Sequence, residues 1–115
     1  MNIKENIKKI IVKKPLKLDC GKTINNYPLA YETYGTLNKE KNNAVLAFHA
    51  LTGDQFVTNT NPITNKPGWW SYLVGPSKAV DTNKFFVICA NVIGGCMGSF
   101  GPSSIDPKTN KTYGT

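Results

Sequence analysis

The sequence predicts an α/β fold in which an antiparallel hairpin precedes the first strands of a mostly parallel sheet. Two unbroken apolar runs, residues 44–48 and 85–90, lack the alternation of a half-exposed strand and are typical of strands covered on both faces. Two other strand-like stretches, residues 16–20 and 27–34, flank a segment at 21–26 whose glycine and asparagines suit a turn. At 115 residues the chain has room for one domain.

Residues 1–15 are predicted to be a basic N-terminal tail, ahead of a single domain that takes up residues 16–115. Isoleucines recur in this tail at helical spacing among lysines, a pattern that also fits a basic amphipathic anchor or a targeting peptide. The segment is short for an anchor, and Glu5 together with the lack of arginine argues against a transit peptide. A loosely packed tail is therefore the expected structure.

The segments between the predicted strands are polar or rich in glycine and proline. Residues 35–43 carry lysines and asparagines and lead into the first apolar run. A loop follows that run, and Trp69 and Trp70 then open a short helix-like piece at residues 68–75. Glycine, proline, serine and asparagine dominate residues 91–115, which predicts a long loop after the second apolar run.

The formal net charge of +7 comes entirely from lysine, because the 14 basic residues include no arginine. Arginine is preferred for bidentate recognition of phosphates and bases, so scattered lysines argue against a nucleic-acid partner. The apolar runs are too short to span a membrane, and the start of the chain lacks the apolar core of a signal peptide. We therefore expect a cytoplasmic protein with neither a nucleic-acid nor a membrane partner.

The cysteines and the single histidine do not form a metal-binding pattern. Cys20, Cys89 and Cys96 show no C-x-x-C spacing, and His49 alone does not complete a zinc set. Free thiols in a reducing compartment are the simplest explanation for an odd number of cysteines. No metal site is predicted.

Residues 47–53 combine the end of a predicted strand, His49 and a small-residue turn that closes at Gly53. An α/β-hydrolase places one amide of its oxyanion hole in such a loop, after its third strand. The chemistry requires backbone N–H groups aimed at a developing negative oxygen, so a tight turn matters more than particular side chains. Strands followed by glycine turns are common, and an ordinary structural turn is the alternative. His49 is expected to satisfy a local hydrogen bond rather than act as a general base, because no carboxylate partner can be assigned.

Residues 94–98 match the pattern G-x-nucleophile-x-G, with Cys96 in the nucleophile position. A nucleophile elbow requires a helix immediately afterwards, because the sharp strand-to-helix turn exposes the nucleophile. The following residues, 99–107, contain glycine and proline and cannot start a sustained helix. The base would also have to be a later histidine, whereas His49 lies upstream. We therefore predict a tight glycine loop beside a cleft, in which Cys96 is not a nucleophile.

Short motifs run through the chain from residue 18 to residue 114. They are LDCGKT at 18–23, LAYETYGTLN at 29–38, HALTGD at 49–54, KPGWW at 66–70, GP at 75–76, DTNKFFV at 81–87, GGCMGS at 94–99, GPSS at 101–104 and KTYG at 111–114. In this order and at this spacing they resemble the homoserine O-acetyltransferase family of the α/β-hydrolase superfamily. The resemblance covers residues 16–115, and several motifs together are far more specific than any one of them.

The resemblance implies the N-terminal part of an α/β-hydrolase fold, which is incomplete because the family's nucleophile elbow follows a later strand. It implies an enzyme that moves an acetyl group from acetyl-CoA to the side-chain hydroxyl of L-homoserine, early in methionine synthesis. The route is ping-pong through an acyl-serine. Acetyl-CoA is then a co-substrate, no cofactor is expected, and the full-length family is expected to form homodimers.

The site residues that the resemblance implies all lie in the turn after the first apolar run. The Leu51 amide is one oxyanion donor, and Ala50 and Thr52 line the substrate pocket. The serine, aspartate and histidine of the family's triad have no counterpart in this chain, and neither does the arginine near the homoserine carboxylate. The chain alone is therefore expected to be inactive, and its apolar strands are expected to make it unstable.

Three interpretations from different classes fit these motifs. The chain is a partial sequence of the acyltransferase, or one subunit of a split enzyme, or a non-catalytic remnant of the fold. A G-x-S-x-G motif followed by a helix in the continuation of the gene would separate them. Homoserine O-succinyltransferase and serine O-acyltransferase activities remain alternatives, because the residues that decide donor and acceptor lie largely beyond Thr115.

Overall fold

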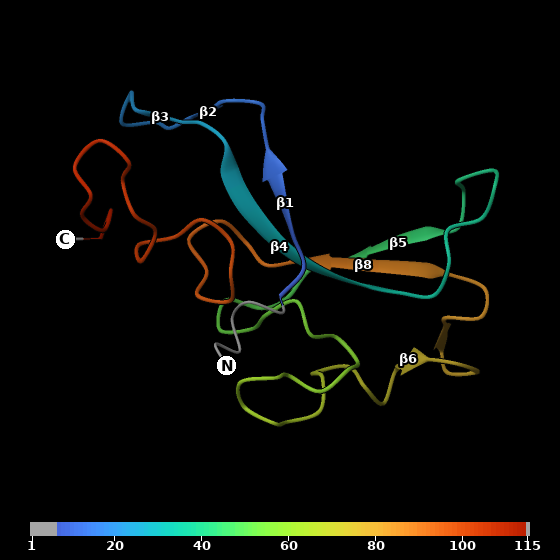
Figure 1. Ribbon diagram of the computed structural model, residues 1–115. Coiled ribbons are helices and arrows are strands. Elements are labelled where there is room, and N and C mark those ends of the chain that lie inside the picture. The colour runs from blue at the N-terminus through green and yellow to red at the C-terminus, as the bar shows by residue number, and fades with distance from the viewer. Residues whose placement is uncertain (1–6, 115) are drawn as a thin grey trace.

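The computed structural model describes residues 7–114, which form short strands joined by long loops (Figure 1). This range contains no helix, and therefore no helix that is long and apolar enough to cross a membrane. The predicted tail before residue 7 lies outside the described residues. The strands are β1 (Lys9–Val12), β2 (Leu16–Lys17), β3 (Thr23–Ile24), β4 (Tyr27–Tyr34), β5 (Ala44–Ala47), β6 (Val74–Gly75), β7 (Val80–Asp81) and β8 (Phe86–Ala90).

The main sheet has four strands in the order β1-β4-β8-β5 (Figure 1). The first half of β4 pairs antiparallel with β1, and its second half pairs antiparallel with β8. β5 runs parallel to β8, with Val45 opposite Val87 and Ala47 opposite Cys89. The two apolar runs are therefore neighbouring parallel strands, as the sequence predicts.

The strand predicted at residues 27–34 is confirmed as β4, but its predicted hairpin partner at 16–20 is wrong. That stretch contributes only the two-residue β2, which pairs with β3 inside the predicted turn segment. The turn closes early, because the Gly21 N–H donates to the Leu18 carbonyl at 2.9 Å. Gly21 has a φ of 82°, which costs glycine no steric strain. β4 is thus free to pair with another strand.

The strand that pairs with the first half of β4 comes from the predicted N-terminal tail. The prediction of a loosely packed tail is therefore wrong for Lys9–Val12, which forms the edge strand β1. Ile10, Ile11 and Val12 are consecutive β-branched residues, and these favour a strand when a sheet edge is available. Next to this strand, the Lys8 ammonium lies 3.2 Å from the buried Glu32 carboxylate of β4. The isoleucines whose spacing suggests a helix therefore belong in part to an edge strand of β-branched residues.

A small core covers one face of the parallel pair. Its buried members are Ala47, Val57, Val74, Val87 and Cys89. Val57 and Val74 belong to the long segment between β5 and β8, so this segment forms the layer over that face. Each fully buried valine stabilises the fold by about 1.5–3 kcal/mol relative to an exposed one.

Tyr34, at the end of β4, ties this covering segment to the sheet. Its hydroxyl donates to Asn59 Oδ1 at 2.6 Å and accepts the Val57 N–H at 3.0 Å. Burial raises the pKa of Tyr34 to about 12. The phenol therefore remains neutral near pH 7 and keeps its proton for this hydrogen bond.

Within residues 7–114 the opposite face of the parallel pair is open at β5, whereas the β8 residues that alternate with the core are half-buried. Leu46 of β5 is 58% exposed, and Phe48, just after β5, is 77% exposed. Among the described residues, the prediction that both faces are covered thus holds for one face and only in part for the other. β5 is also the outermost strand, so one of its edges lacks a backbone partner in this part of the chain.

The predicted helix-like piece at residues 68–75 is wrong, because the chain makes a single turn and then enters β6. The Val74 N–H donates to the Trp70 carbonyl at 2.9 Å, as in a helix, but Gly75 and Pro76 follow and do not favour its continuation. Val74 and Gly75 instead pair in parallel with β7. Residues 91–114 form the predicted loop, with an isolated bridge between Ile105 and Thr112.

Candidate functional site

The chain turns sharply after β5, at residues 50–53. The Gly53 N–H donates to the Ala50 carbonyl at 2.8 Å and closes the turn. A Cβ on residue 53 would lie 3.0 Å from His49 Cβ and 3.1 Å from the Ala50 oxygen, so glycine permits this close approach. The small-residue turn predicted after the first apolar run is therefore present.

Leu51 occupies the tip of this turn and is 98% exposed. Its backbone N–H has no acceptor among residues 7–114. The amide lies beyond the carboxyl end of a parallel strand, which is where open α/β sheets bind ligands. A free donor in this position can stabilise a negatively charged oxygen that forms beside it.

An open hollow of about 560 Å³ lies against the turn. Ala50 and Thr52 both line it, whereas Leu51 does not. The Trp69 and Trp70 rings, with centroids 4.9 Å apart, form an aromatic wall. The full set of lining residues is Phe48, His49, Ala50, Thr52, Gly53, Trp69 and Trp70.

Asp54 anchors the aromatic wall to the turn. Its carboxylate accepts the Phe56 N–H at 2.8 Å and the Asn61 side-chain amide at 2.7 Å. Its carbonyl accepts the Trp69 indole N–H at 2.9 Å. Asp54 is not among the site residues predicted from the sequence, although an aspartate directly after a glycine turn is typical of side chains that bind nearby backbone. The indole is thus held in place by the residue that follows the turn.

His49 is hydrogen-bonded to its neighbour in the turn and to two residues that follow β8. Nδ1 lies 2.7 Å from the Ala50 carbonyl oxygen, and Nε2 lies 3.1 Å from the Val92 nitrogen and 3.3 Å from Asn91 Nδ2. No carboxylate is hydrogen-bonded to the ring within residues 7–114. The expectation that His49 satisfies a local hydrogen bond is confirmed.

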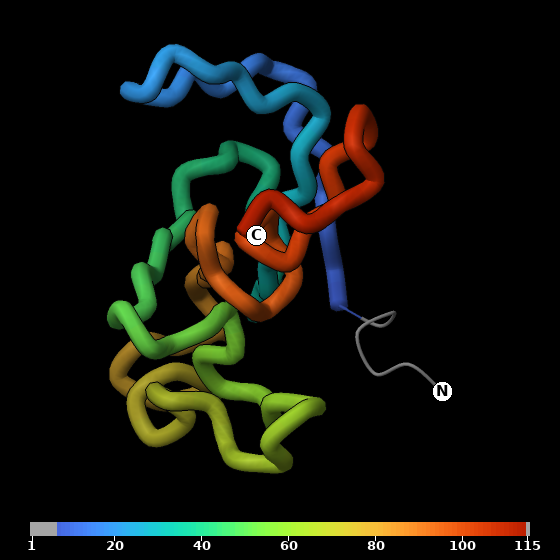
Figure 2. Tube along the Cα trace, turned by 90° about the vertical axis from the view of Figure 1, so that its left-hand side faces the viewer, coloured from blue at the N-terminus to red at the C-terminus, as the bar shows by residue number. Residues whose placement is uncertain are grey.

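Residues 91–101, the glycine loop, pack between β4 and the turn. The Asn91 N–H donates to the Ala30 carbonyl at 2.8 Å, and the Ala30 N–H donates to the Ser99 hydroxyl at 2.9 Å. Figure 2 shows the loop, in orange, beside β4, in teal. The sheet therefore sets the position of this loop, and the loop contacts the turn through His49.

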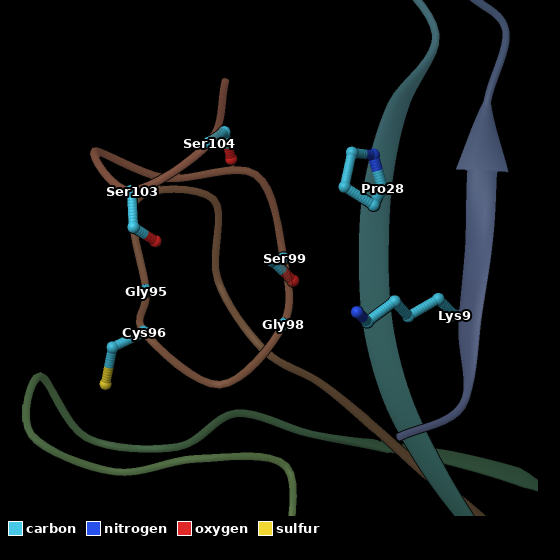
Figure 3. A pocket seen from close by; sticks show the side chains of 8 residues that line it. All are labelled: Lys9, Pro28, Gly95, Cys96, Gly98, Ser99, Ser103 and Ser104. Carbon is cyan, nitrogen blue, oxygen red and sulfur yellow. The ribbon is translucent and has the colours of Figure 1, made fainter. Parts of the chain in front are cut away.

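Cys96 lies on an exposed bend of the glycine loop, at a hollow of about 350 Å³ that Lys9 and several serines also line (Figure 3). In Figure 3 its thiol points away from the Ser103 hydroxyl, and Lys9 lies on the other side of the loop. No helix follows the loop within the described residues, and no hydrogen bond there joins Cys96 to His49. These features favour a glycine loop over an elbow, and the inert role of Cys96 stays a prediction.

Cys89 is a core residue. It is fully buried, and burial raises the pKa of its thiol to about 11. All three cysteines are free thiols, as the sequence predicts. A buried neutral thiol is a poor nucleophile, so Cys89 does not supply one.

The described residues lack a nucleophile paired with a base. Within residues 7–114 no serine or cysteine is hydrogen-bonded to a histidine, and no three potential metal-binding side chains lie together. What these residues bring together is a free amide at a turn, a hollow beside it and a histidine that joins the turn to the glycine loop. Acyl transfer through a serine requires further groups.

Known proteins resemble this chain both in sequence and in structure. The chain is 75% identical over 115 residues to a homoserine O-acetyltransferase of Pelagibacter ubique, and it covers 31% of that protein. It superimposes on homoserine O-acetyltransferase from Bacillus anthracis with a TM-score of 0.80 and 36% identity, covering 92% of this chain and 30% of that one. For esterase E22 the TM-score is 0.77 at 31% identity, with coverages of 93% and 31%. No protein-family model matches the chain.

The chain spans about a third of the length of the curated relative and of both structures. The structural likeness confirms that its sheet is part of an α/β-hydrolase fold, which is the predicted fold class. Within residues 7–114 the structure shows only strands of that fold and none of its helices.

Proposed function

Because the chain belongs to the homoserine O-acetyltransferase family, we propose that it forms the oxyanion side of a site that transfers an acetyl group from acetyl-CoA to L-homoserine. The free Leu51 N–H carries this proposal. It is a donor that no described residue uses, on a turn that borders a hollow. A preorganised donor needs no rearrangement when negative charge develops, and one such group lowers the barrier by about 3 kcal/mol.

In this route a serine first attacks the acetyl carbonyl of acetyl-CoA and expels CoA as the free thiol. The homoserine hydroxyl then attacks the acyl-serine ester and expels the serine hydroxyl. Each attack places negative charge on the carbonyl oxygen, and the Leu51 N–H donates to that oxygen both times. Ala50 and Thr52 border the space that the acetyl group then occupies. Acetyl-CoA is consumed as a co-substrate, so the reaction needs no bound cofactor.

The nucleophile, the base and a second oxyanion donor come from polypeptide outside these 115 residues, which contain no G-x-S-x-G motif and a single histidine. We favour one continuous polypeptide over a separate subunit, because the Pelagibacter ubique relative is a single chain of which this sequence matches 31%. We further propose that this enzyme is a homodimer in the cytoplasm.

Ester hydrolysis is the second candidate, because esterase E22 shares the fold at 31% identity. Both reactions pass through the same acyl-enzyme, and they differ in whether homoserine or water attacks it. The oxyanion role of Leu51 is the same in both cases. The acceptor therefore has to be identified by experiment.

The test is a chimaera in which residues 1–115 replace the matching segment of the Pelagibacter ubique relative. Thiol release from acetyl-CoA and from succinyl-CoA is followed with and without L-homoserine. The proposal predicts release that depends on acetyl-CoA and homoserine, with O-acetylhomoserine as product. Homoserine-independent release with hydrolysis of acetyl esters would favour the esterase, and a folded but inactive chimaera beside an active relative would reject the proposal.

A further inference from the structure

The hydrogen bonds around His49 determine which ring nitrogen carries the proton. The Val92 N–H points at Nε2 over 3.1 Å, and a backbone N–H can only donate. Nε2 must therefore offer its lone pair, and it cannot carry a hydrogen.

A second partner leads to the same assignment. Asn91 is 1% exposed, and its Oδ1 accepts the Met97 N–H at 3.2 Å. Its Nδ2 is therefore the atom left to face His49, and it donates to Nε2 at 3.3 Å. Two independent donors on Nε2 place the ring proton on Nδ1, so Nδ1 donates to the Ala50 carbonyl at 2.7 Å.

The Ala50 carbonyl and the Leu51 N–H belong to the same peptide unit. That unit is planar and trans, so its C=O and N–H point in opposite directions. The Ala50 oxygen accepts from His49 Nδ1 on one side and from the Gly53 N–H on the other, at 2.7 and 2.8 Å. Fixing this oxygen therefore also fixes the direction of the Leu51 N–H.

We infer that His49 is a positioning residue which, as the neutral Nδ1–H tautomer, aims the Leu51 N–H by holding the other end of its peptide group. This inference rests on the proposed oxyanion role of Leu51. His49 also lines the hollow, but in this scheme it acts through the Ala50 carbonyl and not on the reacting atoms.

The glycine loop holds the Asn91 side chain against His49, and this arrangement requires glycine at position 95. A Cβ on Gly95 would lie 2.7 Å from Asn91 Oδ1 and 2.8 Å from Asn91 Nδ2, too close for the amide to keep its place. Glycine at 95 thus leaves room for the amide that faces His49. The chain of contacts runs from Gly95 through Asn91 and His49 to the peptide of Leu51.

The kinetic test compares two substitutions in the active chimaera. His49→Phe removes the Nδ1–H donor and should lower kcat on the order of 10- to 100-fold with the KM for L-homoserine unchanged, because a misaimed donor is felt in the transition state. His49→Asn offers an amide N–H close to the Nδ1 position and should recover much of that kcat. Thermal unfolding of both variants shows whether they fold.

The second test determines the tautomer of His49 from the NMR signals of its ring nitrogens and does not depend on enzyme activity. His49 is the only histidine of this chain, so ligating residues 1–115 labelled with ¹⁵N-histidine to an unlabelled remainder gives the signals of one ring. We expect Nδ1 to carry the proton and Nε2 to show the shift of a bare, hydrogen-bonded nitrogen. A ring protonated on Nε2 near neutral pH would overturn the inference, even if the His49→Phe variant did not fold.

The two failures can be told apart. An unsubstituted chimaera that folds but transfers no acetyl group rejects the proposed function, while the tautomer measurement still reports on His49. An active chimaera whose folded His49→Phe variant keeps its kcat, or whose His49→Asn variant is no better than His49→Phe, rejects the positioning role alone.

Discussion

Leu51 is almost fully exposed, and its N–H has no acceptor within residues 7–114. We expect Leu51→Met, which keeps the N–H, to leave kcat of the chimaera nearly unchanged. Leu51→Pro deletes the N–H and should lower kcat by about 10²- to 10³-fold. Steady-state kinetics measures both, and circular dichroism shows whether the proline variant folds. Small and equal effects in folded variants would remove Leu51 from the oxyanion hole.

Cys96 offers a separate test, because it matches a nucleophile pattern without a following helix or a bonded histidine in the described residues. Cys96→Ser in the chimaera should therefore keep most of the acyltransferase activity. The measurement is turnover with acetyl-CoA and L-homoserine, alongside mass spectrometry of the enzyme. Complete loss of activity in a folded variant, with an acyl adduct mapped to Cys96 in the parent, would contradict this assignment.

The three thiols should react at different rates. Cys20 and Cys96 are exposed, whereas Cys89 is buried with its pKa raised to about 11. Because the thiolate is the reactive form, Cys89 should react with a disulfide reagent at pH 8 roughly tenfold or more slowly than the other two, and faster as pH rises towards 11. Peptide mapping after timed labelling measures the rates, with the urea-unfolded protein as control. Equal rates in the folded protein would mean that the core around Cys89 is open.

Sequence reasoning finds the turn at Ala50, Leu51 and Thr52, because a strand end followed by small residues is a local pattern. It does not find the contact between His49 and Asn91, which are separated by 42 positions. Contacts of this kind depend on how β5 and β8 align, and no local pattern contains that register.

Among the elements, the end of β4 depends on Gly35, which has a φ of 78°. A Cβ there would overlap the carbonyl oxygens of Thr82 and Phe85, whereas Gly21, with a φ of 82°, has nothing within 4 Å. Both alanine substitutions pay the left-handed backbone cost of about 1–2 kcal/mol. Gly35→Ala should lower the free energy of unfolding by clearly more than Gly21→Ala, as measured by urea denaturation of the chimaera. Equal losses would mean that the strand end can shift to make room.

The sequence predicts well those strands that can be recognised from their own residues alone. β8 matches its predicted range closely because it is an unbroken apolar run, and β4 does so because strand-forming residues recur at every second position from Tyr27 to Thr33. The partner of β4 is mispredicted, because Lys9–Val12 competes with the nearer stretch at 16–20 and only the tertiary pairing decides between them. The piece at residues 68–75 is mispredicted because aromatic residues are compatible with either a helix or a turn.

At the scale of the whole molecule, the β5 side of the parallel pair is open, on one face and at its outer edge, within residues 7–114. Leu46 and Phe48 are exposed on the uncovered side, and β5 is the outermost strand. Parallel sheets are normally covered on both faces, and an open apolar edge promotes association. The same region carries the free Leu51 amide, so polypeptide packed against this side of the sheet would lie next to the proposed oxyanion donor.

The most direct measurement is an assay of the purified 115-residue chain for thiol release from acetyl-CoA with L-homoserine, alone and after addition of the remaining part of the Pelagibacter ubique relative. Because the proposed function gives this chain an oxyanion turn but no nucleophile or base, we expect no release above the uncatalysed rate from the chain alone. Homoserine-dependent release on mixing would show that the two parts assemble as a split enzyme. Turnover by the chain alone would contradict this account, because the catalytic centre would then lie within these residues.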